Sequence, residues 1–344
     1  MITPPPEVPY PAVSVIIPAR NEEDSLGVCL ESLVQQQGIA FEIIVVDDHS
    51  TDRTREIATS FPQVKVIEAD PLPPGWTGKA NAVTCGAREA RGSWLLFTDA
   101  DTVHKLGSLA RAVREATERG VALLSYSPEQ EVHSFVEKSV MPVIFAELAS
   151  RYKPAEVSNP NSEAAAANGQ YILISRAAYD AIGGHAAVAG SLLEDVELAR
   201  AVKRSGQKIF FRLGTDQVRT RMYRTTTQLI EGWTKNLVLL FPSPIQLASL
   251  RAAEFTAIWT SGLLALAFFW RGNLALAACA ALLCATLKLF FLRRIFRAHF
   301  AWGSNILAIF GLPFFAYLLL RSVISYRQGR VAWKGRNYPG SAAS

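Results

Sequence analysis

The chain has 344 residues, of which 50% are apolar and 19% charged, and its net charge is +5. This composition can build a buried core, which excludes disordered, collagen-like and disulfide-stapled miniature proteins. From Arg251 onward there are 11 Lys/Arg and a single acidic residue, Glu254, whereas the first 250 residues hold 24 basic and 29 acidic residues. An acidic globular part joined to a basic, apolar tail indicates a membrane and not nucleic acid as partner.

Short apolar runs alternate with amphipathic stretches through the first part of the chain. The predicted strands are 13–17, 41–46, 64–67, 94–98 and 121–127. The predicted helices between them are 25–36, 53–61, 79–90 and 106–118, and Ser50, Thr51 and Asp52 are candidate N-caps of the second. Continuous apolar strands that alternate with helices predict a parallel sheet covered on both faces.

Beyond Tyr126 the alternation loosens. Residues 133–151 have helical spacing, 171–175 predict a strand and 195–205 a further helix. The apolar residues of 133–151 favour either ordinary core packing or a position in the membrane interface, and both interpretations remain open.

The tail contains three apolar segments, 255–270, 274–292 and 300–320. A membrane span needs about 20 apolar residues, so the third is long enough, and the second is if Lys288 reaches the interface. The first segment, at 16 residues, could pair with the second. A buried helical bundle is the alternative, but three such segments with almost no acid are hard to cover with protein.

The basic residues pose a problem of topology. Arg293, Arg294 and Arg297 predict that the second loop is cytoplasmic, yet three crossings would place the basic residues of 321–336 outside, against the positive-inside rule. Either one segment is re-entrant or interfacial, or 133–151 or 229–250 also enters the bilayer. The first residues lack a signal-peptide profile and the four cysteines demand no oxidising compartment, so we expect the globular part in the cytosol. The positive-inside rule favours a cytosolic C-terminus as well.

Acidic residues follow three of the predicted strands. The first strand ends in Pro18–Glu22, the second in Asp47-Asp48 and the fourth in Asp99-Ala100-Asp101. Because ligands of open α/β sheets bind at the carboxyl ends of the strands, these groups are expected to converge. An Asp-x-Asp pair suits a hard divalent cation that bridges phosphates, although each acid alone could be a helix cap or a turn former.

Three further positions carry polar groups that suit chemistry. Lys79 begins a predicted helix and could bind a nucleotide phosphate, but Pro73 and Ala80 exclude a P-loop, and the alternative is a solvated lysine. Glu194-Asp195 begins another helix, as a cap or as a general base. His185 is a candidate metal ligand, although a single histidine is more often structural.

In this order, over residues 13–233, the motifs resemble a family 2 glycosyltransferase. The resemblance implies the GT-A fold, a Rossmann-like, mostly parallel sheet of nucleotide-diphospho-sugar transferases, followed here by C-terminal transmembrane helices. It implies that Pro18, Ala19, Arg20, Glu22 and Asp48 hold the base and ribose of the donor. Lys79 would lie near the base or phosphates.

The same resemblance implies roles for the remaining acids. Asp99 would contact the nucleotide and Asp101 would hold Mg²⁺ or Mn²⁺, for which Asp99 and His185 are further candidate ligands. Asp195, with Glu194 beside it, would be the base of an inverting reaction, in which the anomeric carbon is attacked opposite the leaving diphosphate.

One motif departs from the family pattern. Membrane-embedded glycan synthases carry Gln-x-x-Arg-Trp after the base, whereas this chain has Gly232 before Trp233. Arg221, Arg224, Lys235 or the basic tail could supply the missing charge. Residues 74–79, 221–223, 232–236 and 333–338 resemble the branch with hopanoid-associated and 4,4′-diaponeurosporenoate (carotenoid) glycosyltransferases.

The expected organisation is a catalytic domain at 1–235, an interfacial connector at 236–254, a transmembrane region at 255–320 and a basic tail at 321–344. The expected activity is transfer of one sugar from a nucleotide sugar, UDP-linked, to a carotenoid, hopanoid or other membrane lipid. The alternatives are a polyprenyl-phosphate sugar synthase, a polysaccharide synthase and a catalytically silent membrane scaffold. The sugar, the lipid and the oligomeric state stay open.

Overall fold

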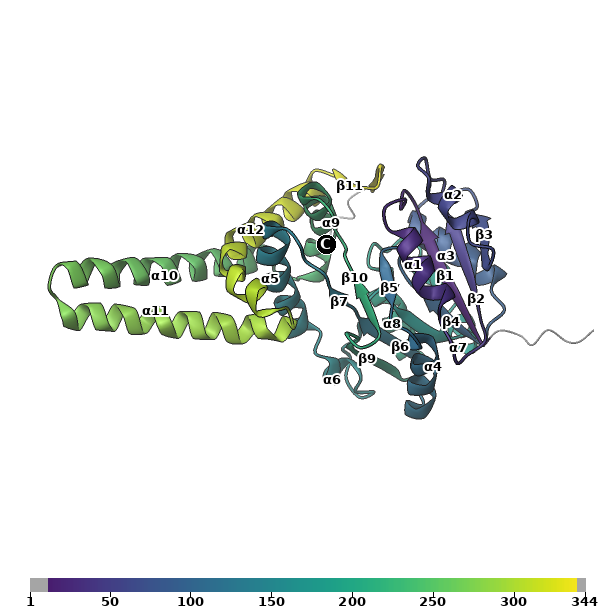
Figure 1. Cartoon of the computed structure of the whole chain (residues 1–344), viewed down its shortest axis with the longest axis horizontal. Helices are drawn as coiled ribbons and strands as arrows, with labels where there is room; N and C mark the ends of the chain where they lie inside the picture. Colours follow the sequence, from purple (N-terminus) through teal and green to yellow (C-terminus); the bar gives the residue numbers. More distant parts are fainter. Residues whose placement is uncertain (1–11, 339–344) are drawn as a thin grey trace, which may run out of the picture. The chain divides into compact units, whose positions relative to one another are not determined.

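A computed structural model describes residues 12–338, which form two compact units (Figure 1). The first unit comprises residues up to 131 and 152–221, and the second comprises 132–151 and the residues from 222 onward. The outer ends of the expected ranges 1–235 and 321–344, and the start of the chain assessed for a signal peptide, lie outside the described residues.

A seven-stranded sheet in the order β3-β2-β1-β4-β8-β6-β9 forms the centre of the first unit. Its strands are β1 Val13–Ala19, β2 Phe41–Asp47, β3 Val64–Glu68, β4 Trp94–Phe97, β6 Leu123–Ser127, β8 Ile172–Ser175 and β9 Ile209–Leu213. Strand β8 is antiparallel to both β4 and β6, and the remaining pairs are parallel. The mostly parallel sheet is therefore confirmed, and an entirely parallel one is wrong at β8.

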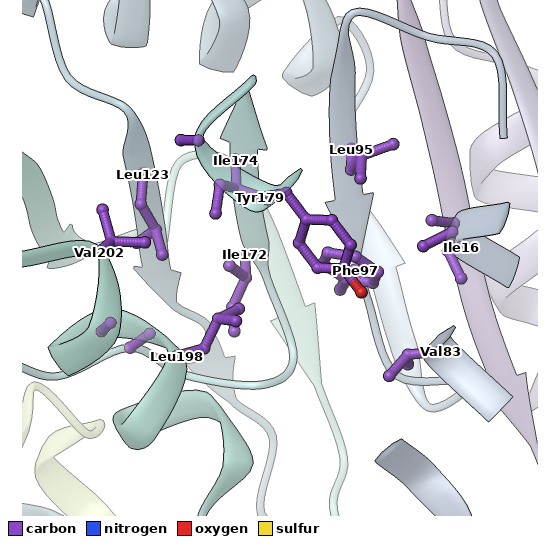
Figure 2. Packing of buried hydrophobic residues seen from close by; sticks show 14 of the residues in the cluster. Ile16, Val83, Leu95, Phe97, Leu123, Ile172, Ile174, Tyr179, Leu198 and Val202 are labelled. Carbon is purple, nitrogen blue, oxygen red and sulfur yellow. The ribbon is translucent and has the colours of Figure 1, made fainter. Parts of the chain in front are cut away.

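Helices cover both faces of this sheet, as the alternating pattern predicted. They are α1 Leu26–Val34, α2 Thr54–Thr59, α3 Gly78–Glu89, α4 Ser108–Arg119, α6 Pro154–Val157, α7 Arg176–Ala181 and α8 Glu194–Arg204, with a 3₁₀ turn η1 at Gly184–Val188. Ile16 and Phe97 pack with Val83 of α3 and Leu198 of α8 in one core (Figure 2). Ile17, the next residue of β1, belongs to the core of the other face, because successive strand side chains point to opposite faces.

One sheet of the first unit was not predicted, and the cap of α2 differs from the prediction. A second sheet of three short strands has the order β5-β10-β7, with bounds Thr102–His104, Val218–Thr220 and Glu129–Gln130. The N-cap residue of α2 is Arg53 and not one of the three predicted candidates, although Asp52 accepts a hydrogen bond from the Thr54 N–H (3.0 Å).

The second unit is helical. Its elements are α5 Phe135–Arg151, α9 Thr226–Leu240, α10 Pro244–Trp270, α11 Leu274–Ile295, the 3₁₀ turn η2 Phe296–Ala298, α12 Trp302–Arg327 and a hairpin of β11 Val331–Trp333 and β12 Arg336–Tyr338. Within the described residues, three helices are long and apolar enough to cross a membrane, namely 244–270, 274–298 and 302–327. The first apolar segment is therefore part of a 27-residue helix, so its shortness is no obstacle.

The three apolar helices differ in how much protein covers them. The most apolar stretch of α10 is 11% buried and that of the α11 helix 17%, whereas that of α12 is 50% buried. Helices α10 and α11 lie side by side as a hairpin (Figure 1). Helix α12 packs closely on α5, where the Gly311 backbone contacts the backbone of Ser139. Residues 133–151 thus form a packed helix, the first of the two interpretations.

Candidate functional site

The segments after β1 and β2 are fastened to each other by hydrogen bonds. The Asp48 N–H donates to the Ala19 carbonyl (2.8 Å), and the Arg20 guanidinium donates to the carbonyls of Asp48 (2.7 Å) and His49 (3.3 Å). Asp48 is buried. The Arg20 side chain therefore holds the loop that carries Asp48, at the carboxyl edge of the sheet.

The same two segments are joined further along. The Asn21 N–H donates to Ser50 Oγ (3.1 Å), the Thr51 N–H to Asn21 Oδ1 (2.9 Å), and the Glu22 N–H to Thr54 Oγ1 (2.7 Å). Asn21 has a φ of 51°, in the left-handed region that asparagine tolerates better than most residues. We call residues 18–22 and 47–54 the β1/β2 rim.

Lys79, in the first turn of α3, is bonded to two carboxylates. Its Nζ lies 2.8 Å from Asp99 Oδ1, after β4, and 3.0 Å from Glu194 Oε1, the first residue of α8. Burial lowers the pKa of Lys79, but the charges of Asp99 and Glu194 outweigh it and raise the pKa well above its ordinary value. The ammonium group therefore stays charged and is held by two ion pairs, although the Lys79 side chain is 36% exposed.

Asp195 is oriented by two backbone N–H groups. Its Oδ2 accepts from Gly169 (2.9 Å) and its Oδ1 from Val196 (2.8 Å). Burial and the Glu194 charge raise the pKa of Asp195 to about 6, against the opposing charge of Lys79. A Cβ at position 169 would lie 2.8 Å from Lys79 Nζ, so a larger residue there would displace the end of the Lys79 side chain.

His185 is a buried, neutral imidazole. Its Nδ1 shares a hydrogen bond with the Tyr179 hydroxyl (3.1 Å), and its ring meets Phe97 edge to face at 4.5 Å between centroids. Burial lowers the pKa of His185 to about 4, and Glu194 opposes this shift.

A small cavity brings several of the predicted residues together. It is lined by Pro18, Lys79, Val83, Phe97, Thr98, Asp99, Gly169, Ile172, His185, Glu194 and Asp195. Residues from β1, α3, β4, η1 and α8 thus meet at one point at the carboxyl edge of the sheet. Gly169 also lines this cavity, although it belongs to none of the acidic motifs.

The Asp-x-Asp motif lies in the loop between β4 and β5. Asp101 Oδ1 lies 3.5 Å from the Thr102 hydroxyl, and the Asp101 carbonyl accepts from Thr220 Oγ1 (3.2 Å). In the described part of the chain no group of three His, Cys, Asp or Glu side chains could hold a metal ion. A pair of carboxylates nevertheless fits Mg²⁺ or Mn²⁺, because such ions take their remaining ligands from phosphates and water.

Two features singled out in the sequence, Arg224 and the glycine at position 232, lie in the second unit. The Arg224 N–H donates to Gln228 Oε1 (2.9 Å) at the start of α9. A Cβ at Gly232 would lie 2.4 Å from the Tyr223 hydroxyl and 2.5 Å from its ring. The motif described above has arginine at position 232. In this chain the Tyr223 ring fills the space that a side chain at position 232 would need.

The sheet order, the helices on both faces and the acidic carboxyl edge are those of the GT-A fold. In agreement, the chain is similar to a solved mannosyltransferase, PcManGT from Pyrobaculum calidifontis, with a TM-score of 0.55 and 19% identity over 92% of this chain and 87% of that one. At this identity the likeness concerns the fold.

Residues 14–183, just under half of the chain, match Glycosyl transferase family 2, which supports a glycosyltransferase. It is 28% identical to the 4,4′-diaponeurosporenoate glycosyltransferase of Staphylococcus aureus over 96% of this chain and 88% of the relative. It is 32% identical to the Staphylococcus haemolyticus protein of that name over 66% of this chain and 61% of the relative. The family and its carotenoid glycosyltransferase branch, inferred from the motifs, are confirmed.

Proposed function

We propose that this glycosyltransferase moves one sugar from a UDP-linked donor to a membrane lipid, with inversion at the anomeric carbon. The observation that carries the proposal is the cluster of Asp99, Lys79, Glu194 and Asp195 around one cavity at the carboxyl edge of the sheet. The three apolar helices of the same chain support a lipid acceptor.

The β1/β2 rim and Lys79 are the proposed donor site. Pro18, Ala19, Arg20, Glu22 and Asp48 lie in or beside its fastened loops, which suit a rigid base-and-ribose site. Lys79 would offer its positive charge to the diphosphate. Arg224 is proposed to offset the charge of the leaving group.

A divalent cation, Mg²⁺ or Mn²⁺, is proposed to be held by Asp101 and Asp99, with His185 as a further candidate. The similar mannosyltransferase was solved with GDP-Man and Mn²⁺. When bound, the cation would supply positive charge to the departing diphosphate.

Asp195 is the proposed general base, with Glu194 beside it. With a pKa of about 6, its carboxylate is ionised at neutral pH and close enough in basicity to accept a proton. It would take the proton of an acceptor hydroxyl while that oxygen bonds to the anomeric carbon and the bond from carbon to diphosphate oxygen breaks. The curated relatives are named for the carboxylate 4,4′-diaponeurosporenoate. An acceptor that reacts through an ionised carboxylate has no proton for a base to remove.

We propose that the catalytic unit faces the cytosol and that only the α10–α11 hairpin crosses the membrane. Helix α12 is half covered by helices that carry charges, since α5 packs on it and α9 bonds to it through Ser322 Oγ and the Thr234 carbonyl (2.7 Å). Charged helices are not accommodated in hydrocarbon. An even number of crossings returns the basic tail to the cytosol, in accord with the positive-inside rule.

The hairpin has the length that one bilayer requires. At its base Arg251 and Arg294 form ion pairs with Glu147 and Glu254 at 2.7–3.3 Å. The 20 steps from Arg251 to Arg271 rise about 30 Å at 1.5 Å per residue, the thickness of a hydrocarbon core.

A polyprenyl-phosphate sugar synthase would use the same donor site and is the second candidate. A polysaccharide synthase is disfavoured by Gly232 in place of the motif arginine. A silent scaffold is disfavoured by the convergence of Asp99, Glu194 and Asp195.

The test uses detergent-solubilised protein, Mn²⁺ or Mg²⁺, a panel of nucleotide sugars and a total bacterial lipid extract. We expect metal-dependent release of nucleoside diphosphate that rises with lipid and is lost in Asp101→Ala and Asp195→Ala. Glu118→Ala, which removes an exposed carboxylate of α4, is the matched control and keeps full activity. Folded wild-type protein that neither turns over nor binds any nucleotide would favour the scaffold.

A further inference from the structure

We propose that Gln170 is a positioning residue that holds the Asp99–Asp101 loop and the Asp195 carboxylate in fixed relation. The inference rests on the proposed function, because it assigns both groups to one reaction. Gln170 lies in the turn before β8, in neither of the acidic motifs, and its side chain is 4% exposed.

The Gln170 side chain reaches the metal-motif loop through a hydroxyl. Its Nε2 donates to Thr220 Oγ1 (3.1 Å), and Thr220 Oγ1 donates to the Asp101 carbonyl (3.2 Å). Thr220 is 1% exposed, so water cannot replace either bond. The Thr220 hydroxyl has one proton, which it gives to Asp101, so it must accept from the Gln170 amide.

The Gln170 backbone holds the other side of the same loop. Thr98, directly before Asp99, donates its Oγ1 proton to the Gln170 carbonyl (2.8 Å), and His104 Nε2 lies 3.1 Å from that hydroxyl. Since Thr98 has given its proton to Gln170, His104 must be the donor. One residue thus fastens the Asp-x-Asp motif at both ends.

The adjacent peptide holds the proposed base. The Gly169 N–H donates to Asp195 Oδ2 (2.9 Å) and the Gln170 N–H to Asn168 Oδ1 (3.0 Å). The Asn168 N–H donates to Ser125 Oγ of β6 (2.8 Å), which anchors the turn to the sheet. A displacement of residues 168–170 would therefore move the proposed metal-binding loop and the base together.

This arrangement predicts a specific set of variants. Thr220→Val keeps the shape of the side chain but leaves the Gln170 amide and the Asp101 carbonyl without their partner. Thr220→Ser keeps the hydroxyl and should restore binding. Gln170→Met interrupts the same path from the other side, so the inference does not depend on one variant. Thr234→Val, in α9 of the second unit, is the control for loss of a buried hydroxyl.

The experiment titrates Mn²⁺ into detergent-solubilised protein with UDP and follows free Mn²⁺ by electron paramagnetic resonance. We expect the half-saturating Mn²⁺ concentration to rise about 10-fold in Thr220→Val and Gln170→Met, as for other residues that support metal ligands. Thr220→Ser and Thr234→Val should match wild type. The thermal midpoint of each variant is measured alongside.

The outcomes separate this inference from the proposed function. Wild-type protein that binds no Mn²⁺ in the presence of UDP would overturn both. Wild-type binding with unchanged half-saturation in Thr220→Val and Gln170→Met would overturn the positioning role alone, as would an equal shift in Thr234→Val. A lowered thermal midpoint with unchanged Mn²⁺ binding would assign these residues to stability only.

Discussion

At the residue scale, Asp195 lies in an environment that disfavours its ionised form. Burial and the neighbouring Glu194 charge raise its pKa to about 6 from an ordinary value of 3.8. The folded state therefore binds more protons than the unfolded state between these two pH values, and wild-type stability falls as the pH rises through this window. Above pH 6 the carboxylate is mostly ionised in the folded state, so its unfavourable environment lowers the stability of the protein most. This ionised form is the one that can act as the proposed base.

Asp195→Asn is expected to become more stable relative to wild type as the pH rises from 4 to 7, by about 2 kcal/mol. The absolute difference also contains the loss of one backbone hydrogen bond, so the change with pH is the diagnostic quantity. Thermal unfolding in detergent across this range measures it, with Glu118→Gln as an exposed control. A difference that stays constant with pH would contradict the raised pKa.

Part of the candidate site could be predicted from the sequence, because Asp99 follows a predicted strand and Lys79, Glu194 and Asp195 begin predicted helices. Asp99, Glu194 and Asp195 do meet in space, and Lys79 joins them. The supporting residues could not be predicted. Gln170 and Thr220 belong to no motif, and their function depends on a path of hydrogen bonds through three elements far apart in the sequence.

At the scale of elements, periodicity located the strands and helices well but not their direction. A four-residue apolar strand such as β8 has the same pattern in a parallel and an antiparallel pair. Strands β5, β7 and β10 have two or three residues each, too few to show any period. Helix α5 was found, but its partner α12 lies more than 150 residues later and no local pattern reveals it.

The contact between α5 and α12 gives a prediction. A Cβ at Gly311 would lie 2.0 Å from the Ser139 carbonyl oxygen, so Gly311→Ala must push the two backbones apart. We expect a loss of about 1–3 kcal/mol, seen as a lower thermal midpoint.

Gly303→Ala is the matched control for this change. It lies in the same helix with nothing within 4 Å of the added Cβ. Alanine is the better helix former, so this variant should be neutral or slightly stabilising. Equal midpoints for the two variants would show that α5 and α12 do not pack closely.

At the scale of the whole molecule, the sequence located three apolar segments but could not decide how many of them cross a membrane. Hydropathy scores α12 like α11, since both are long and apolar. The distinction lies in what covers them. Half of the apolar stretch of α12 is buried, against 17% for the α11 helix, and one-dimensional patterns contain no information on coverage.

Single cysteines test the proposed topology, in a variant whose exposed native cysteine is removed by Cys279→Ala. Asn273→Cys lies at the turn between α10 and α11, His299→Cys follows η2, and Arg330→Cys follows α12. A membrane-impermeant maleimide applied to intact cells should label position 273 only, because two crossings return the chain to the cytosol. Positions 299 and 330 should react after permeabilisation, which also shows that each thiol is accessible. Labelling of position 330 in intact cells would mean that α12 crosses the bilayer. The charged helices α5 and α9 could then not pack along α12 as the proposed topology requires.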